Sequence, residues 1–373
     1  MWLFLIGLLG PPAHAQSCVE GLEGVLDEIQ GRFPQSVSGD ALYKAALDGV
    51  AAHLGEELGS TGNRVLSKAD YEDTKAWLDG RRYGIGAEFS VVSGRGLQLT
   101  EVFDDSPADQ SGLVAGDLIV TVDAHPLTGL STNAILDRVQ RQKHARSVFD
   151  VLHSDGSVGR MEVQRGPYQL ATVRIRQEKD ALVIRMPFFG SGAASQMRRA
   201  LQEWDGSAVV LDLRDNGGGS MDEMVACADL FLDPDAVVVE TSNGSDYVHT
   251  LSGTGDAAWT TEVVIIVNKG TAGVAEAFVA ALQDHGRAQV VGPHTSGRGL
   301  QTSFYPAGRG LVLEIADTWL RSPSGRSWHG AGIVPNVFVE AQQLSLPASS
   351  KPDLLDLQRD AAIRLMTSGA GEQ

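Results

Sequence analysis

The chain has 373 residues, of which 43% are hydrophobic and 21% charged, and its formal net charge is −17. This length is enough for two or three domains with cores of their own, and the composition is that of a globular protein, which excludes a fibre or a disordered chain. The negative charge argues against nucleic-acid and anionic-membrane partners, because their phosphate groups repel such a field.

The first residues predict a secretory signal peptide, residues 1–15. The apolar run Trp2–Gly10 is shorter than the roughly 20 apolar residues that span a bilayer, and it leads to Ala13-His14-Ala15, which fits the small-x-small rule for cleavage. We expect cleavage near Ala15 and export to the periplasm or the extracellular space, with no membrane span left in the mature chain. A buried N-terminal strand is the alternative, because no Lys or Arg precedes the apolar run.

Export would place the two cysteines, Cys18 and Cys227, in an oxidising compartment where they can pair. Cys227, however, lies on a predicted helix, residues 221–232, where a single Cys is usually a small buried hydrophobe. The sequence leaves both interpretations open.

Residues 16–80 predict an N-terminal helical region. Asp40–Leu58 has an apolar face typical of an amphipathic helix, with Asp40 as its expected N-cap. Ser67-Lys68-Ala69-Asp70 has the form of a capping box before a second helix that ends at Leu78. We expect these helices to pack on the fold or to form a homo-oligomer surface.

Residues 81–166 predict a compact, mostly β unit. Gly84-Ile85-Gly86 opens a strand, Ser106-Pro107-Ala108 begins a helical turn, Leu118–Val122 has the composition of a strand, and residues 131–142 have helical spacing. The motifs Ser-Pro-Ala, Gly-Leu and Gly-Asp-Leu-Ile, in this order, resemble those of a PDZ domain.

The PDZ resemblance implies a unit that binds an extended chain end by adding it to a strand edge, with free N–H groups converging on the terminal carboxylate. A PDZ domain that binds no peptide is the alternative, because glycines also mark ordinary turns. The expected peptide-binding residues are Gly84, Ile85, Gly86, Ala87 and, on the facing helix, Leu136.

Residues 167–345 alternate strands and helices, which predicts a mixed α/β (α+β) domain. Leu182–Met186 and Ala208–Leu213 are short apolar runs typical of buried strands, with a predicted helix, residues 191–204, between them. The second run ends in Arg214-Asp215-Asn216-Gly217-Gly218-Gly219 and a further helix. Such a turn allows the backbone to approach a carbonyl oxygen closely, and a tight turn without a ligand is the alternative.

A second strand–turn–helix element runs from Val263 to Gln301. The β-branched run Val263–Val267 predicts a strand buried on both faces, and Ala275–His285 has helical spacing. A short strand, residues 288–291, and a polar loop, residues 292–299, follow. We expect this loop and the turn before the helix to face each other at one sheet edge, where α/β enzymes place their chemistry.

The run from Val267 to Gly299 resembles the active-site segment of the C-terminal processing serine peptidases, also called tail-specific proteases. That family has an Asn-x-Gly-Ser-Ala-Ser-Ala-Ser-Glu turn and a helix ending in Gln-Asp-His-Gly-Arg-Ala. The glycine-rich turn at 214–219 resembles the family's Leu-Arg-x-Asn-x-Gly-Gly, which implies that Gly218 and Gly219 supply oxyanion-hole N–H groups. Ser322–Asn336 resembles a further family motif, to which we assign a structural role. A last helix, Asp353–Met366, is expected to pack on the core as part of residues 346–373.

The resemblance implies a Ser/Lys dyad whose two side chains are absent here. The family's nucleophilic Ser precedes the Glu of the turn by three residues and aligns with Gly273, before Glu276, and its Lys base aligns with Arg298. The family's orienting Gln follows its Lys by four residues, whereas Gln301 follows Arg298 by three. Acyl transfer requires a nucleophile, and a guanidinium stays protonated at physiological pH.

These two substitutions leave two functional hypotheses. We favour an exported pseudopeptidase that binds protein or peptide C-termini. The alternative is an active serine endopeptidase, cutting near protein C-termini, with a relocated active site. Its hydroxyl would come from Thr271 or Ser296 and its base from His285, His294 or His329. No metal-ligand spacing or phosphate-binding loop appears, so we expect no cofactor.

Overall fold

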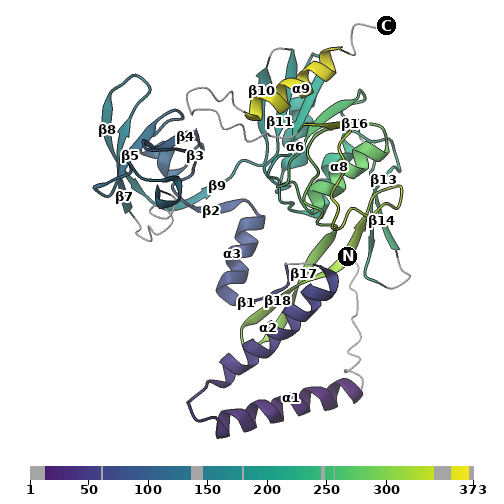
Figure 1. Cartoon of the computed structure of the whole chain (residues 1–373). Helices are drawn as coiled ribbons and strands as arrows, with labels where there is room; N and C mark the ends of the chain where they lie inside the picture. The colour runs from purple at the N-terminus through teal and green to yellow at the C-terminus, as the bar shows by residue number, and fades with distance from the viewer. Residues whose placement is uncertain are drawn as a thin grey trace. The chain divides into compact units, whose positions relative to one another are not determined.

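A computed structural model of the chain describes residues 13–59, 62–135, 146–178, 180–244, 248–255, 257–339 and 354–368 (Figure 1). The chain divides into two compact units. The first takes its described residues from Met1–Tyr71 and Thr302–Asp317, and the second takes them from Glu72–Gln301 and Thr318–Gln373.

The first unit joins the N-terminal helices to part of a β-hairpin. The edge strand β1 pairs antiparallel with β18, from Arg64 opposite Glu314 to Ser67 opposite Leu311. The Tyr43 hydroxyl donates to the carbonyl of Ala307 at 2.7 Å. The elements are α1 (Ala13–Arg32), α2 (Gly39–Leu58), β1 (Arg64–Ser67), the start of α3 (Lys68–Leu78), and parts of β17 (Leu300–Gly308) and β18 (Leu311–Arg321).

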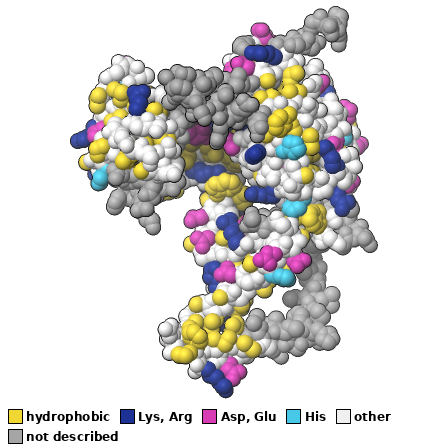
Figure 2. All heavy atoms as spheres, in the orientation of Figure 1, with side chains coloured by type: hydrophobic (Ala, Val, Ile, Leu, Met, Phe, Trp, Pro, Cys, Tyr) yellow, Lys and Arg dark blue, Asp and Glu magenta, His cyan; other side chains and the backbone are white. Residues whose placement is uncertain are grey.

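The helix caps of this unit correct one prediction and confirm another. Helix α2 begins at Gly39, and Ser38 is its N-cap because the Ser38 hydroxyl accepts the Ala41 N–H at 3.1 Å. The prediction of Asp40 as the cap is therefore wrong. The predicted capping box is present, because Ser67 Oγ accepts the Asp70 N–H and Asp70 Oδ2 accepts the Ser67 N–H. Hydrophobic side chains gather over α1 and α2 on the face shown in Figure 2.

The β-rich segment predicted at residues 81–166 forms a sheet in the order β3-β4-β5-β7-β8, with β6 beside β5. Strand β3 is an edge of this sheet, and the core beneath contains Leu97, Leu99, Ile119 and Phe149. The strands β2 (Arg81–Gly84) and β9 (Gly166–Gln169) pair where the chain enters and leaves it. The other elements are β3 (Ala87–Val92), β4 (Gly96–Val102), α4 (Pro107–Gln110), β5 (Leu118–Val122), β6 (His125–Pro126), β7 (Arg146–Leu152) and β8 (Val158–Gln164).

The rest of the second unit is an α/β domain around a six-stranded sheet in the order β10-β11-β12-β15-β16-β19. The five strands from β11 to β19 are parallel, and β10 is an antiparallel edge. The strands are β10 (Arg174–Glu178), β11 (Ala181–Arg185), β12 (Ala208–Asp212), β15 (Val263–Ile266), β16 (Ala288–Gly292) and β19 (Val337–Phe338), and the helices are α6 (Ala193–Glu203), α7 (Met221–Asp229), α8 (Val274–Asp284) and α9 (Leu354–Ser368).

Both faces of this sheet are covered, which explains its unbroken apolar strands. Side chains such as Leu211 and Ile265 pack with α6, α7 and α8, and their neighbours Val210 and Val264 pack with α9 on the opposite face (Figure 1). Cys227 lies in the first of these cores with a free, fully buried thiol, and burial raises its pKa.

Several strands were not predicted from the sequence. They include β13 (Val237–Ser242), β14 (Val248–Ser252) and the hairpin of β17 and β18. β13 pairs with β14, and Glu240 to Ser242 of β13 pair with Arg321 to Trp319 of β18. Among the residues with described positions, no helix has both the length and the apolar character needed to cross a membrane.

Candidate functional site

Three loops meet at the carboxyl ends of the parallel strands, where α/β folds place their ligands. Residues 213–219 follow β12, residues 267–273 follow β15, and residues 293–299 follow β16. The Ala272 N–H donates to the Asn216 carbonyl at 2.9 Å, and the Ser296 N–H donates to the Thr271 carbonyl at 2.9 Å. The structure therefore brings together the three segments that the sequence analysis selected.

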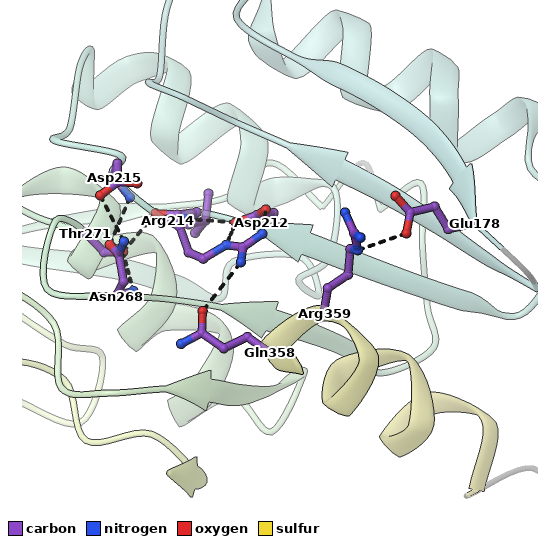
Figure 3. Close-up of polar contacts among 9 residues, drawn as sticks. Glu178, Asp212, Arg214, Asp215, Asn268, Thr271, Gln358 and Arg359 are labelled. Carbon is purple, nitrogen blue, oxygen red and sulfur yellow. Dashed lines mark hydrogen bonds and ion pairs between the residues drawn. The ribbon is translucent and has the colours of Figure 1, made fainter. Parts of the chain in front are cut away.

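The turn after β15 is held by polar side chains that the sequence analysis did not select. Asn268 Oδ1 accepts the N–H groups of Asp215 and Gly270, each at 2.9 Å, and Asn268 Nδ2 donates to Asp215 Oδ1 at 2.9 Å (Figure 3). An Asn at the start of a glycine turn is a signal that sequence reasoning can use, because its amide mimics a backbone turn.

Thr271 belongs to this framework. Its side chain is fully buried, its hydroxyl donates to the Leu213 carbonyl at 2.8 Å, and the same oxygen accepts the Asn268 N–H at 3.1 Å. The first hydrogen bond joins the loop after β15 to the loop after β12, and the second lies within the loop after β15. A hydroxyl held in this way has no proton free for a base and no open path to a substrate carbonyl.

Gly273 occupies the strand-to-helix turn as the N-cap of α8, with φ 63° and ψ −125°. Its N–H donates to Glu276 Oε2 at 3.0 Å. This left-handed region is costly for residues with a Cβ. In such a sharp strand-to-helix turn, a side chain at position 273 would project away from the helix, but glycine has no side chain.

Glu276 is the central residue of the site and is fully buried. Besides the Gly273 N–H, its carboxylate accepts the N–H groups of Gly297 at 2.7 Å and Arg298 at 2.8 Å, and the Thr295 hydroxyl at 2.5 Å. Burial raises the pKa of Glu276, and these hydrogen bonds act against that effect. One carboxylate thus joins the turn before α8 to the loop after β16.

Three of the remaining predicted positions are exposed and a fourth is half-buried. Arg298 is exposed, and no described residue forms an ion pair with its side chain, while Gln301 is half-buried. Ser296 and His294 are also exposed, and His294 Nδ1 lies 3.4 Å from the Ala331 carbonyl.

The other two histidines proposed as bases lie in different surroundings. His285 caps the opposite end of α8, with its Nε2 at 2.7 Å from the Val237 carbonyl. The His329 ring packs edge-on against Trp319, with 5.2 Å between ring centroids. Among the contacts of the described residues, none joins Thr271 or Ser296 to one of these three histidines.

The two glycines predicted for an oxyanion hole differ in their hydrogen bonding. The Gly218 N–H donates to Asn216 Oδ1 at 2.9 Å, and Asn216 Nδ2 donates to the Met186 carbonyl at 2.9 Å. Within the described part of the chain, the Gly219 N–H and the Val274 N–H have no acceptor. Val274 is the first residue of α8, where an N–H has no partner within the helix.

The residues predicted to bind a peptide surround the start of β3. Gly84 ends β2, Ala87 begins β3, and Gly86 has φ 75°. The carbonyls of Ile85 and Gly86 accept the N–H groups of Ala108 and Phe103, at 2.7 Å and 3.0 Å. The predicted contact Leu136 lies outside the described residues. The described residues contain no group of three or more His, Cys, Asp or Glu side chains placed to hold a metal ion.

Comparison with known proteins agrees with this architecture. Residues 180–339 match the model of peptidase family S41. A probable CtpA-like serine protease of Staphylococcus haemolyticus is 26% identical over 330 residues, or 87% of this chain and 65% of that protein. A second, from Staphylococcus saprophyticus, is 27% identical over 339 residues, or 88% of this chain and 68% of that protein. The chain thus spans 65% to 68% of the length of these two relatives.

Two solved structures share the fold. A putative S41 protease from Bacteroides fragilis has a TM-score of 0.62 at 15% identity and covers 93% of this chain and 97% of that one. A photosystem II D1 C-terminal processing protease has a TM-score of 0.53 at 21% identity, with coverage of 92% and 93%. Residues 180–339 are thus similar in sequence to peptidase family S41, and the chain shares the fold of these two solved structures.

Proposed function

We propose that this chain is a pseudopeptidase of the C-terminal processing type, which binds protein or peptide C-termini without cutting them. The observation that carries the proposal is the turn before α8. Gly273 holds the position from which a nucleophile would act, in a conformation suited to that task, and it has no side chain. Loss of the nucleophile alone costs a serine protease on the order of a millionfold in turnover.

The position of the general base supports the same conclusion. Arg298 replaces the family's Lys, and a guanidinium does not release its proton at physiological pH. Its side chain is also exposed, whereas an amine with a pKa near neutrality needs a desolvated site. The substitutions at 273 and 298 together remove both halves of a Ser/Lys mechanism.

Binding is proposed for the segment of residues 81–166, as a PDZ domain. Strand β3 is a sheet edge, so its outward N–H and C=O groups are open to an added strand. Among the described residues, none accepts the N–H of Ile85 or Gly86, which precede this edge. Such N–H groups suit a chain-terminal carboxylate.

The proposed partners are protein or peptide C-termini, and nucleic acid is not among them because the chain carries a net charge of −17. We further propose that the chain is exported after cleavage near Ala15, a residue that lies at the start of α1. N-terminal sequencing of the protein recovered from the exporting host tests the cleavage site.

The test of the proposed function is a proteolysis assay on residues 16–373 with an unfolded, reduced and alkylated protein as substrate. We expect no cleavage above the level of a matched Gly273→Ala variant, together with saturable binding of a peptide that has a free C-terminus. Cleavage that survives repurification and is lost in Thr271→Val or Ser296→Ala would instead establish an endopeptidase with a relocated nucleophile.

A further inference from the structure

Three arginines lie on one face of the strands β10 and β11. Arg174 and Arg176 are two residues apart on β10, so their side chains share a face. Arg185 of β11 lies directly opposite Arg174 in the antiparallel register. Like charges directly opposite each other destabilise a sheet, so this arrangement needs negative charge from elsewhere.

The acidic side chains near these arginines are already engaged. Asp212 accepts two hydrogen bonds from the guanidinium of Arg214, and both side chains are almost completely buried. Glu178 pairs with Arg359 of α9 at 2.9 Å (Figure 3). These two pairs leave no carboxylate of the six-stranded sheet for the three arginines.

Arg174 is the best neutralised of the three. Its side chain is 10% exposed and contacts the carboxylate of Glu101, with Glu88 at 3.8 Å. Burial lowers the pKa of Arg174, and the charges of Arg185 and Arg176 lower it further, against the effect of Glu101 and Glu88. Arg174 is therefore close enough to Arg176 and to Arg185 to be repelled by both.

Two of the three arginines lack an ion pair within the described part of the chain. Arg176 and Arg185 form no ion pair with any residue that the structure describes. The Nε of Arg185 and the Nη2 of Arg174 are also buried without an acceptor. A buried charged donor without an acceptor is expensive, and such groups in folded proteins usually have a partner.

These donors surround a cavity of about 240 Å³. Its ionisable lining is five arginines and four carboxylates, and this positive excess stands out in a chain of net charge −17. The lining residues are Glu88, Thr100, Glu101, Arg174, Arg176, Glu178, Val183, Arg185, Asp212, Arg214 and Arg359.

We infer that this cavity is a binding site for a doubly charged oxyanion, a phosphate group held by Arg185 and Arg176 together with the free Nη2 of Arg174. Two unneutralised guanidinium groups match the two negative charges of a phosphate, and the planar fork of arginine fits its oxygens. The three arginines that would hold the phosphate lie on β10 and β11, outside the loops around Gly273, so the inference does not rest on the proposed function.

The test is isothermal titration of the full chain with inorganic phosphate at pH 8 and constant ionic strength, with acetate as the singly charged comparison. A parallel titration with phenyl phosphate tells a site for free phosphate from one that accepts a phosphate monoester. We expect saturable phosphate binding that is weaker by about tenfold or more in Arg185→Gln, because a charge-assisted hydrogen bond is lost.

The matched control is Arg199→Gln, which removes an exposed arginine of the same domain outside this cavity and should leave binding unchanged. Circular dichroism establishes that each variant is folded, and the exposed Arg176→Gln carries the test if Arg185→Gln does not fold. Absence of saturable binding by the wild-type chain, or equal binding by the Arg185, Arg176 and Arg199 variants, would overturn the inference.

Discussion

A Cβ atom added to Gly273 would have the carbonyl oxygen of Gly217 as its nearest neighbour, at 3.7 Å. This is an ordinary van der Waals separation, so the turn has room for a side chain. A side chain at this position still costs stability through the backbone. Holding a residue with a Cβ at φ 63° and ψ −125° lowers the free energy of unfolding by about 1–3 kcal/mol.

The first prediction is that the double variant Gly273→Ser with Arg298→Lys gains measurable proteolysis of an unfolded protein. The new hydroxyl would precede the Val274 N–H in the chain, and the Val274 and Gly219 N–H groups, which have no acceptor among the described residues, are available to stabilise a developing oxyanion. Recovery should be partial, because position 298 is exposed and a solvated amine keeps its proton at neutral pH.

Neither single variant should cut, because a Ser without a neutral amine is not activated and a Lys without a nucleophile has nothing to deprotonate. The matched control is Gly273→Ala with Arg298→Lys, which has the same backbone strain and no hydroxyl. If the Ser/Lys variant is folded and cuts no faster than this control, the loops have lost the geometry of a peptidase.

The second prediction concerns Glu276, whose carboxylate accepts four donors. Glu276→Gln should lower the free energy of unfolding by about 1–3 kcal/mol, because the amide turns an acceptor into a donor that faces backbone N–H groups. Urea unfolding of the two proteins measures the difference.

The pH dependence of that difference follows from the pKa of Glu276, which burial raises above its ordinary value. The stability that this group contributes is fully present below about pH 4, where the unfolded chain is also protonated, and is lost as pH rises through the folded-state pKa. The advantage of the wild type over Glu276→Gln should therefore shrink between pH 4 and pH 8. A wild-type advantage that grows over this range would mean that the four hydrogen bonds lower the pKa of Glu276 by more than burial raises it.

The third prediction separates structure from catalysis at Thr271. Thr271→Val keeps the shape of the side chain but leaves the Leu213 carbonyl and the Asn268 N–H without their partner. We expect a loss of about 1–3 kcal/mol in the free energy of unfolding and no change in peptide binding. Thermal unfolding and a peptide titration measure the two quantities, and Ser296→Ala, at an exposed position, serves as the control of unchanged stability.

The fourth prediction is that residues 81–166 bind a peptide only through its free carboxylate. Amidation of the peptide C-terminus should abolish binding in a fluorescence-anisotropy titration, because the Ile85 and Gly86 N–H groups then face no negative charge. Equal binding of the free and amidated peptides would contradict the assignment of this loop.

Gly86→Val should disrupt the same loop. A Cβ at position 86 would lie 2.2 Å from the Ser106 Cβ, and φ 75° disfavours a β-branched residue. Gly94→Ala is the matched control, because Gly94 also has positive φ but no neighbour within 4 Å of an added Cβ.

The sequence by itself determined the α/β domain and the segments that form its site. Unbroken β-branched runs such as Val263–Ile266 indicate buried parallel strands, and the turns that follow such strands meet at one sheet edge. The absence of a hydroxyl at 273 and of an amine at 298 is likewise a property of the sequence alone.

Only the tertiary structure decided which polar groups are available at that edge. The hydroxyl of Thr271, the amide of Asn216 and the carboxylate of Glu276 are hydrogen-bonded to residues outside their own loops, at separations that local periodicity does not encode. The same holds for the opposition of Arg174 and Arg185, which depends on the register of β10 and β11. Composition and spacing indicate the secondary structure and burial that each segment favours. Hydrogen-bond partners and strand register follow instead from the packing of the whole chain.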